Sequence, residues 1–360
     1  MVTVGGFAHV RPVVIGGGSP VVIQTMWKEP LTLDSAEETE RVLGRIEGLA
    51  AIGCRLLRFA VPQIEDADVL GRLALGTAMP LVADIHFDYR IALRCLDYPI
   101  AKLRINPGNI GGEDRVRAVL EKAAEKGRPI RIGVNAGSLP RDLREQADRG
   151  EIALPRTLVA AAERELAVFD RYAFPNVIVS MKASSVPDTV TAARLFREKH
   201  GGASPIPLHV GVTEAGPLIA GVVRNTAALT GLLKDGIGDT IRVSLSSTME
   251  NEVIAAREIL ALFADSTSIR LVSCPRCGRA SFDTHGFTER WQMRLYAAGK
   301  KATIAVMGCV VNGPGEARAA DLGITGAGNK VLLFRHGEKI RTVDVEDADR
   351  AFEEELSKLE

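Results

Sequence analysis

The sequence lacks the features of a membrane, secreted or disulfide-bonded protein. Nowhere in its 360 residues does an uninterrupted apolar run approach about 18 residues, the length that a membrane-spanning helix requires. The N-terminus has no basic stretch followed by an apolar run, so we expect no secretory signal. Cysteine is scarce, and its five residues are an odd number. We therefore expect a cytoplasmic protein whose clustered cysteines bind a metal rather than form disulfides.

Neither sign of charge is in excess. Lys and Arg together number 45, as do Asp and Glu, and this balance indicates no surface for nucleic acid or membrane. Any cationic site must therefore be local. Hydrophobic residues make up 46% of the chain, which allows a large buried core and argues against disorder. The length suits a barrel of roughly 250 residues with a smaller second domain.

Short apolar runs alternate with helical patterns up to about residue 263, as in a parallel α/β sheet. Eight βα units favour a closed (β/α)8 TIM-type barrel over an open doubly wound sheet, and the first βα turn lacks the G-x-G-x-x-G of dinucleotide-binding folds. The eight runs are Val21–Met26, Arg55–Phe59, Leu81–Ile85, Ala101–Ile105, Ile130–Val134, Val177–Met181, Pro207–Val212 and Thr240–Leu245.

Two helices carry clear boundary signals. Ser35-Ala-Glu-Glu38 is a capping box at the start of the first, and Gly53 stands where a C-cap glycine belongs. The second runs from Glu113 to Lys126 and ends with Gly127.

Segments outside the barrel have patterns of their own. Phe7–Ile15 and the turn Gly16-Gly17-Gly18 predict an N-terminal hairpin that closes the barrel bottom. The pattern changes after Ala264-Asp265-Ser266, so we expect a barrel domain over residues 1–264 and a small α+β domain over residues 265–360. That domain should contain strands Arg270–Ser273, Thr303–Met307 and Lys330–Phe334 and a helix around Thr288–Ala298.

Five of the strands end near a cation. The active site of such a barrel lies at the C-terminal ends of its strands, so these charges should share one rim. Burying like charges together is unfavourable unless an anion neutralises them, and Arg and Lys suit phosphate. We interpret the rim as a site for a ligand with more than one phosphate group. The alternative is that each cation pairs with a nearby carboxylate or points into solvent. The five residues are Arg58, Arg104, Arg131, Lys182 and Arg242.

Further polar residues follow the same strands, among them Asp84, Asn106, Asn135 and Ser244. His86, in Asp84-Ile-His86, can be a structural histidine or an acid–base or ligand-orienting group. Glu214 can be a surface residue, but its Gly-rich turn just past a strand favours a role in the site.

Three cysteines cluster near the C-terminus. Cys274-Pro-Arg-Cys277 and Cys309 together offer three thiolates, which select zinc, copper(I) or iron–sulfur clusters. A structural zinc site normally closes with a fourth Cys or His; His285 and His336 are candidates, whereas Glu316 offers a carboxylate. The spacing favours a [4Fe–4S] cluster but leaves zinc, and inert or redox thiols, open. Cys54 and Cys95 are expected to be small core residues.

Several segments, in order along nearly the whole chain, carry a family resemblance. They are Leu81–Arg90, Leu103–Asn109, Arg131–Gly137, Val212–Gly216, Gly236–Ser244, the Cys274/Cys277 pair and Gly308–Ala317. With them the chain resembles the 4-hydroxy-3-methylbut-2-enyl diphosphate synthase family of the methylerythritol phosphate pathway to isoprenoids, in its form without a large insertion.

The resemblance implies an iron–sulfur oxidoreductase with a barrel followed by a cluster domain. It implies a [4Fe–4S] cluster on Cys274, Cys277 and Cys309, with Glu316 as a displaceable fourth ligand. The implied reaction is the two-electron reductive ring opening of 2-C-methyl-D-erythritol 2,4-cyclodiphosphate, with loss of water. A flavodoxin or ferredoxin would donate the electrons. Barrel and cluster of one active site would come from different subunits of a head-to-tail homodimer.

The resemblance also assigns roles at the rim. His86 and Asn135 would line the pocket, Glu214 is the candidate proton donor, and Asp84 is a weaker one. The diphosphate would be held by Arg58, Arg104, Arg131, Lys182, Arg242 and Ser244.

The chain departs from the family after its first strand. The family usually has a Thr- and Asn-containing stretch where this chain has Met26-Trp27-Lys28-Glu29-Pro30, which leaves the contacts of the first βα loop open. Two rivals remain. One is another barrel enzyme, such as a pterin-binding transferase, with a zinc-stabilised tail. The other is a metal-stabilised module that binds phosphorylated ligands without turnover.

Overall fold

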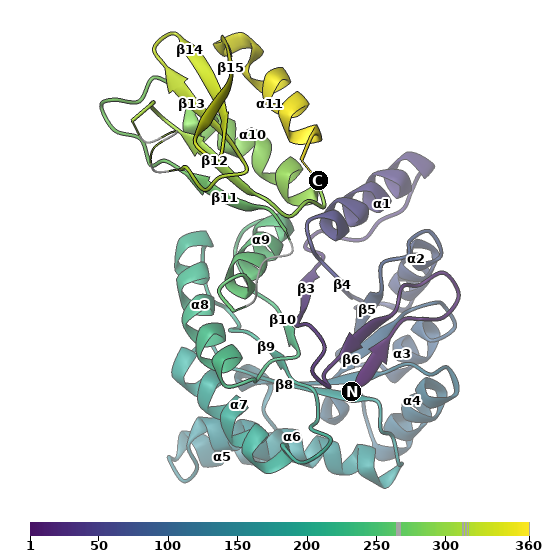
Figure 1. The fold of residues 1–360 in the computed structure, drawn as a ribbon. Coiled ribbons are helices and arrows are strands. Elements are labelled where there is room, and N and C mark those ends of the chain that lie inside the picture. The colour runs from purple at the N-terminus through teal and green to yellow at the C-terminus, as the bar shows by residue number, and fades with distance from the viewer. Residues whose placement is uncertain (264–267, 312, 314, 316, 360) are drawn as a thin grey trace. The chain divides into compact units, whose positions relative to one another are not determined.

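The computed structural model describes residues 1–263, 268–311, 313, 315 and 317–359. The chain divides into two compact units, Met1–Phe263 and Ala264–Glu360, and each contains a sheet of its own (Figure 1). Among the described helices, none combines the length and the apolar character needed to cross a membrane.

The first unit is a barrel of eight parallel strands, in the order β8-β7-β6-β5-β4-β3-β10-β9. Its ring is completed between β9 and β8, where Val179 forms a parallel bridge with Leu208 and its N–H donates to the carbonyl of Pro207 at 3.0 Å. The barrel prediction is therefore confirmed, and each predicted run overlaps one strand. The strands are β3 (Val22–Met26), β4 (Leu56–Ala60), β5 (Leu81–Asp84), β6 (Lys102–Ile105), β7 (Ile130–Asn135), β8 (Val177–Lys182), β9 (His209–Val210) and β10 (Thr240–Ile241).

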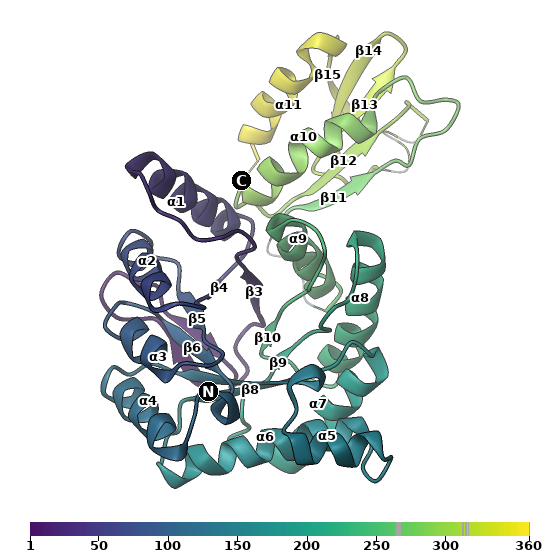
Figure 2. The same cartoon turned by 180° about the vertical axis from the view of Figure 1, so that it is seen from behind.

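Helices surround the strands on the outside of the barrel (Figures 1 and 2). Two short 3-10 helices, η1 (Pro107–Asn109) and η2 (Ala136–Ser138), follow β6 and β7. The α-helices of this unit are α1 (Ala36–Ala51), α2 (Ile64–Leu75), α3 (Tyr89–Cys95), α4 (Glu113–Glu125), α5 (Arg141–Asp148), α6 (Leu154–Arg171), α7 (Val186–His200), α8 (Leu218–Lys234) and α9 (Met249–Leu260).

The predicted helix boundaries are largely confirmed. Ser35 caps α1 by accepting a hydrogen bond from the N–H of Glu38. The Glu38 carboxylate accepts from the N–H of Asp34 rather than from Ser35, so the predicted capping box is only half formed. Gly53 and Gly127 follow the ends of α1 and α4 with φ of +113° and +64°, a left-handed conformation that glycine adopts without strain.

The bottom of the barrel is closed by an N-terminal hairpin of β1 (Val2–Val4) and β2 (Val13–Ile15). The prediction that the hairpin begins at Phe7 was wrong, because Phe7 lies in the connection between two strands of only three residues each. The closure itself is confirmed, because the hairpin packs into one cluster with residues near the starts of the barrel strands. That cluster contains Val2, Val4, Val10, Ile15, Val22, Leu56, Val82, Ala101 and Ile178.

The second unit is a five-stranded mixed sheet in the order β11-β12-β13-β14-β15, with two α-helices among its described residues. The three predicted strands are confirmed as β11 (Arg270–Ser273), β12 (Thr303–Met307) and β14 (Lys330–Arg335). The predicted helix is α10 (Thr284–Ala297), which begins earlier than expected because Asp283 caps it. The elements that sequence analysis missed are β13 (Leu322–Ala327), β15 (Glu338–Asp344), η3 (Val345–Asp347) and α11 (Ala348–Ser357).

Three aromatic side chains fill the core of the second unit. Phe287 and Trp291 on α10 both pack against Phe352 on α11, with ring centroids 5.1 and 4.8 Å from the Phe352 ring. The second unit thus has a hydrophobic core of its own, to which β11–β14 and both helices contribute.

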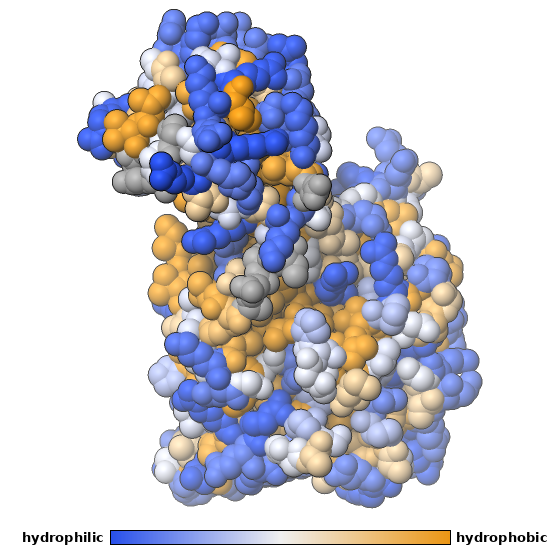
Figure 3. Space-filling model, in the orientation of Figure 1, coloured by the Kyte–Doolittle hydropathy of each residue, from blue (hydrophilic) through white to orange (hydrophobic). Residues whose placement is uncertain are grey.

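The face of the molecule in Figure 3 mixes hydrophilic and hydrophobic residues. Apolar side chains are exposed at the start of α8, where Leu218, Ile219 and Val223 reach the surface (Figure 3). Leu218 also borders a shallow, largely apolar groove between α8 and α9.

Glu165 on α6 supports the loop that follows β6. Its side chain is buried, and its carboxylate accepts a hydrogen bond from the N–H of Gly108. Burial raises the pKa of Glu165 to about 7, although Gly108 and Arg164 oppose the rise. The folded protein therefore retains a proton that the unfolded chain has already released, so Glu165 lowers stability as the pH rises from about 4.5 to 7.

Replacing Glu165 with Gln should remove this dependence on pH. We expect the free energy of unfolding of Glu165→Gln, relative to wild type, to be higher at pH 8 than at pH 5 by on the order of 2 kcal/mol. Urea unfolding at the two pH values measures this difference. The control is Glu121→Gln, because the Glu121 side chain is exposed on the surface of α4. An equal response of both variants to pH would contradict the prediction.

Candidate active site

A cavity of about 210 Å³ lies at the C-terminal ends of the barrel strands. Ligand pockets usually span roughly 300–1,000 Å³, so this cavity favours a compact ligand. Most of the residues predicted for the rim line it, whereas Asn106 and Glu214 do not. Met26 and Thr213 line it without having been predicted as site residues. The lining consists of Met26, Arg58, Asp84, His86, Arg104, Arg131, Asn135, Lys182, Thr213, Arg242 and Ser244.

Strand register explains why residues so far apart in sequence meet here. Arg104 on β6 lies in register with Asp84 on β5 and with Arg131 on β7, while Asn135 pairs with Lys182 on β8. Alternate residues of a strand face the same side, so the residues of this rim point into the barrel together.

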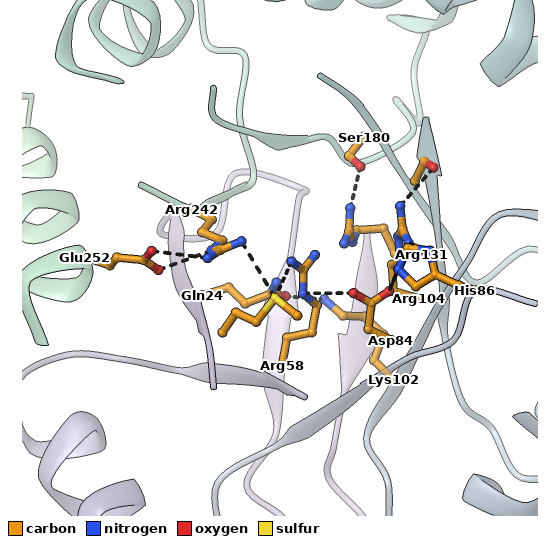
Figure 4. Close-up of polar contacts among 12 residues, drawn as sticks. Gln24, Arg58, Asp84, His86, Lys102, Arg104, Arg131, Ser180, Arg242 and Glu252 are labelled. Carbon is orange, nitrogen blue, oxygen red and sulfur yellow. Dashed lines mark hydrogen bonds and ion pairs between the residues drawn. The ribbon is translucent and has the colours of Figure 1, made fainter. Parts of the chain in front are cut away.

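Asp84 is the carboxylate at the centre of this arrangement (Figure 4). Its oxygens lie 3.0 Å from Arg104 Nη1, 3.5 Å from Arg58 Nε and 3.4 Å from His86 Nε2. Burial alone would raise the pKa of Asp84, but Arg58, His86 and Arg104 together hold it well below its ordinary value. Asp84 is therefore ionised and better suited to orienting its neighbours than to donating a proton.

A second carboxylate, Glu252 on α9, is buried beside Arg242. The Nε and Nη2 atoms of Arg242 each lie 3.2 Å from an oxygen of Glu252 (Figure 4). Sequence analysis missed Glu252, whose only signal was an acidic residue in the first turn of the helix after the last strand.

Three further cations have no carboxylate partner in the described part of the chain. Arg131 donates from Nη1 to Ser180, and its Nε and Nη2 are buried without a hydrogen bond. Lys102, fully buried, donates to Gln24 Oε1 at 3.2 Å. The Lys182 side chain forms no hydrogen bond or ion pair with any described residue. Burial, together with the neighbouring guanidinium groups, lowers the pKa of all three well below the ordinary values.

The barrel thus holds more buried positive charge than its carboxylates neutralise. Such a site favours the binding of an anion, because the anion supplies negative charge that the carboxylates of the barrel do not provide. Sequence analysis did not name Lys102 or Gln24, although Lys102 precedes Arg104 by two residues and so faces the same side of β6.

The Met26 side chain contacts two of the guanidinium groups. Its Sδ atom lies 2.8 Å from Arg58 Nη2 and 3.8 Å from Arg242 Nη1. A thioether is a weak acceptor, so the N–H groups of both arginines that face Met26 stay largely available to an anionic ligand.

Gly133 makes room for Arg104. The Nη2 atom of Arg104 donates to the carbonyl of Gly133 at 3.2 Å, and a Cβ atom at Gly133 would lie 2.3 Å from Arg104 Nε. Any larger residue at Gly133 would therefore displace the Arg104 guanidinium.

Glu214 lies apart from the cavity. Its side chain is exposed, and its φ of +51° is a left-handed conformation that is uncommon for a residue other than glycine. Strained residues of this kind gather at functional sites, and the preceding residue, Thr213, lines the cavity.

The predicted cluster ligands lie in the second unit, where Cys274 and Cys309 follow the adjacent parallel strands β11 and β12. The N–H of Cys274 donates to Val306 at 2.9 Å, and a Cβ atom at Gly308 would lie 3.7 Å from Cys274 Sγ. The Cys274 thiol is thus beside the turn that carries Cys309. Cys277 lies on the loop after β11 and is exposed.

The described residues do not themselves complete a group of three His, Cys, Asp or Glu side chains that could hold a metal ion. Glu316, the predicted fourth ligand, lies outside the described residues. The donor set nevertheless fits an iron–sulfur cluster, because cysteine thiolates are the usual ligands of such a cluster. Cys54 and Cys95 are buried core residues as predicted, and burial raises the pKa of each thiol to about 12.

Known proteins resemble this chain over nearly its full length. The family model of the GcpE TIM-barrel domain matches residues 7–257, and that of the GcpE protein C-terminal domain matches residues 270–358. The 4-hydroxy-3-methylbut-2-en-1-yl diphosphate synthase (flavodoxin) of Treponema pallidum is 50% identical, over 99% of this chain and 91% of the relative.

A more distant relative and a solved structure complete the comparison. The enzyme of the same name from Geobacter sulfurreducens is 41% identical over 98% of this chain and 96% of its own. The dihydropteroate synthase of Thermus thermophilus is 17% identical, with 73% of this chain and 98% of that chain covered and a TM-score of 0.46. That likeness is too weak to bear on function.

Replacing Gly133 with Ala should weaken the binding of anions by displacing Arg104. We expect the dissociation constant for inorganic pyrophosphate, measured by calorimetry, to rise about tenfold in Gly133→Ala. The matched control is Gly137→Ala, because an added Cβ there meets nothing within 4 Å. Equal affinities in the two variants would show that Arg104 does not depend on the space at Gly133.

Proposed function

The chain belongs to the GcpE family, and from this membership we propose that its barrel cavity binds and opens a cyclic diphosphate. The activity is that of 4-hydroxy-3-methylbut-2-en-1-yl diphosphate synthase, an iron–sulfur oxidoreductase of isoprenoid biosynthesis. It converts 2-C-methyl-D-erythritol 2,4-cyclodiphosphate to 4-hydroxy-3-methylbut-2-enyl diphosphate. Two electrons and protons enter, one carbon–oxygen bond of the ring breaks, and water leaves.

The observation that best supports a diphosphate ligand is the set of cations without carboxylate partners. We assign the diphosphate to Arg58, Arg104, Arg131, Lys182, Arg242 and Ser244, all of which line the cavity. Two phosphate groups would supply the negative charge that Arg131 and Lys182 lack within the described chain. Arginine would contact them through paired N–H groups, whereas Lys182 would act as a point charge.

Asn135 and His86 would orient the rest of the ligand, because both line the same cavity. Asp84 holds Arg58, Arg104 and His86 in place and stays ionised, so we assign it a positioning role before that of a proton donor. Glu214 remains the proposed donor. Its loop would have to bring it toward the cavity once the ligand is bound, as catalytic hydrogen bonds often form only in the complex.

We assign the cofactor to the second unit, as a [4Fe–4S] cluster held by Cys274, Cys277, Cys309 and Glu316. When bound, the cluster supplies electrons and a Lewis-acidic iron. Because the names of the relatives include flavodoxin, we propose flavodoxin or ferredoxin as the electron donor. A reducing cytoplasm would keep these thiols free of disulfides.

We further propose a head-to-tail homodimer in which the barrel of one subunit works with the cluster domain of its partner. Two features support an association of this kind: each unit has a core of its own, and apolar side chains are exposed on α8. An exposed apolar patch often marks a protein–protein interface.

Anaerobic purification followed by metal analysis and turnover tests the proposal. We expect a coloured protein with about four irons and four sulfides per chain. With reduced flavodoxin it should convert the cyclodiphosphate to the linear diphosphate. A colourless protein with stoichiometric zinc and no turnover would favour the pterin-binding transferase or the non-catalytic module instead.

Glu316→Cys tests the displaceable ligand. A fourth thiolate should hold the iron more firmly than a carboxylate does, so we expect the variant to keep its visible absorption and iron content while turnover falls about a hundredfold or more. Glu346→Cys, in η3, is the control. Full activity of Glu316→Cys would contradict the proposal that Glu316 is a displaceable ligand.

A further inference from the structure

The first βα loop, which contains Trp27, Lys28 and Glu29, has a defined structure. Trp27 is buried and stacks on Phe59, with ring centroids 5.4 Å apart. The Arg45 guanidinium lies 5.4 Å from the centre of the Trp27 ring and pairs with Glu29 and Glu250. The loop is therefore held in place between α1 and the start of α9.

Lys28 connects this first loop to the last one. Its Nζ atom donates to the carbonyls of Leu245 and Ser247, at 2.8 and 2.5 Å, and lies 2.9 Å from Glu252 Oε1. All three acceptors belong to the segment that follows β10 or to the first turn of α9. One ammonium group thus joins the loop after the first barrel strand, β3, to the segment after β10.

Glu252 links Lys28 to Arg242, because it contacts both side chains. The Glu252 side chain is 1% exposed, and besides Lys28 it accepts from Thr25 Oγ1 at 2.6 Å and from the N–H of Leu245 at 3.0 Å. It also receives both Nε and Nη2 of Arg242. Two parallel contacts fix the plane of a guanidinium, so the Nη1 group of Arg242, which contacts no carboxylate among the described residues, is presented to Met26 and the cavity.

Lys28 also adds positive charge beside the cavity. A lone Glu252–Arg242 pair would be neutral and would offer little attraction to an anion. Burial alone would raise the pKa of Glu252, but Arg242 and Thr25, with help from Leu245 and Lys28, hold it below its ordinary value, so Glu252 is an anion. With Lys28 added, the three side chains carry a net positive charge beside the cavity.

We propose that Lys28 is a positioning residue for the diphosphate site, acting through Glu252 to orient Arg242 and to keep its surroundings cationic. The inference rests on the proposed function for the identity of the ligand. It assigns the Trp27-Lys28-Glu29 segment a role in substrate affinity. A purely structural role, in which Lys28 only joins two loops, predicts a loss of stability with unchanged affinity.

Three substitutions separate charge from loop structure. Lys28→Met removes both the charge and the hydrogen bonds, Lys28→Gln keeps a donor without the charge, and Lys28→Arg keeps the charge. Lys199→Met is the matched control, because Lys199 lies on α7 and, among the described residues, pairs only with Glu163. The readouts are the affinity of the anaerobically purified holoenzyme for inorganic pyrophosphate, KM and kcat for the cyclodiphosphate, and the melting temperature.

We expect Lys28→Met and Lys28→Gln to raise the dissociation constant for pyrophosphate, and KM, by about fivefold to tenfold, because each removes one positive charge near the anion. The value of kcat should stay within about twofold, since Lys28 touches no reacting atom. Lys28→Arg should restore the affinity, and high salt should narrow the difference from wild type.

Wild-type affinity in Lys28→Met or Lys28→Gln, whatever the melting temperature, would overturn the inference. If Lys28→Met does not fold, Lys28→Gln decides. Pyrophosphate affinity judges the role of Lys28, whereas turnover of the cyclodiphosphate by wild type judges the proposed function, so the two can fail separately.

Discussion

Six cationic side chains converge inside one barrel, and within the described chain only Asp84 and Glu252 pair with them as carboxylates. The rest of the site follows from this imbalance. Asp84 holds Arg58 and Arg104 at the mouth, and Glu252 holds Arg242. We propose that a ligand anion neutralises the charges that remain. The six are Arg58, Lys102, Arg104, Arg131, Lys182 and Arg242.

Buried charge of one sign destabilises a fold unless other contacts offset it. In this barrel Lys102 and Arg131 are buried, while at the bottom the hairpin residues Val4 and Ile15 pack on the strand starts in an apolar cluster. Stability and function are thus divided along the barrel axis. The lower end supplies hydrophobic burial, while the upper end holds the buried cations that we propose a ligand neutralises.

Much of this arrangement could be predicted from sequence, because strand periodicity and strand ends are local patterns. The rim residues, Lys182 for example, followed from the place of each residue on its strand. Glu252 and Gln24 could not be predicted in this way, since their roles depend on which side chains meet across the barrel. The strands β13 and β15 were not predicted, because their sequences carry few local signals. The conformation of the Glu214 loop could not be predicted either, because periodicity does not encode it.

The central claim is that an anion completes the charge balance of the barrel. Its most direct test is the melting temperature of the protein with inorganic pyrophosphate, compared with sodium chloride at equal ionic strength. A ligand that binds only the folded state raises stability by about 3 kcal/mol at a hundredfold excess over its dissociation constant. We predict a clear, saturable rise with pyrophosphate and little change with chloride. Identical melting curves in the two salts would contradict the account, because the buried cations would then not need a ligand.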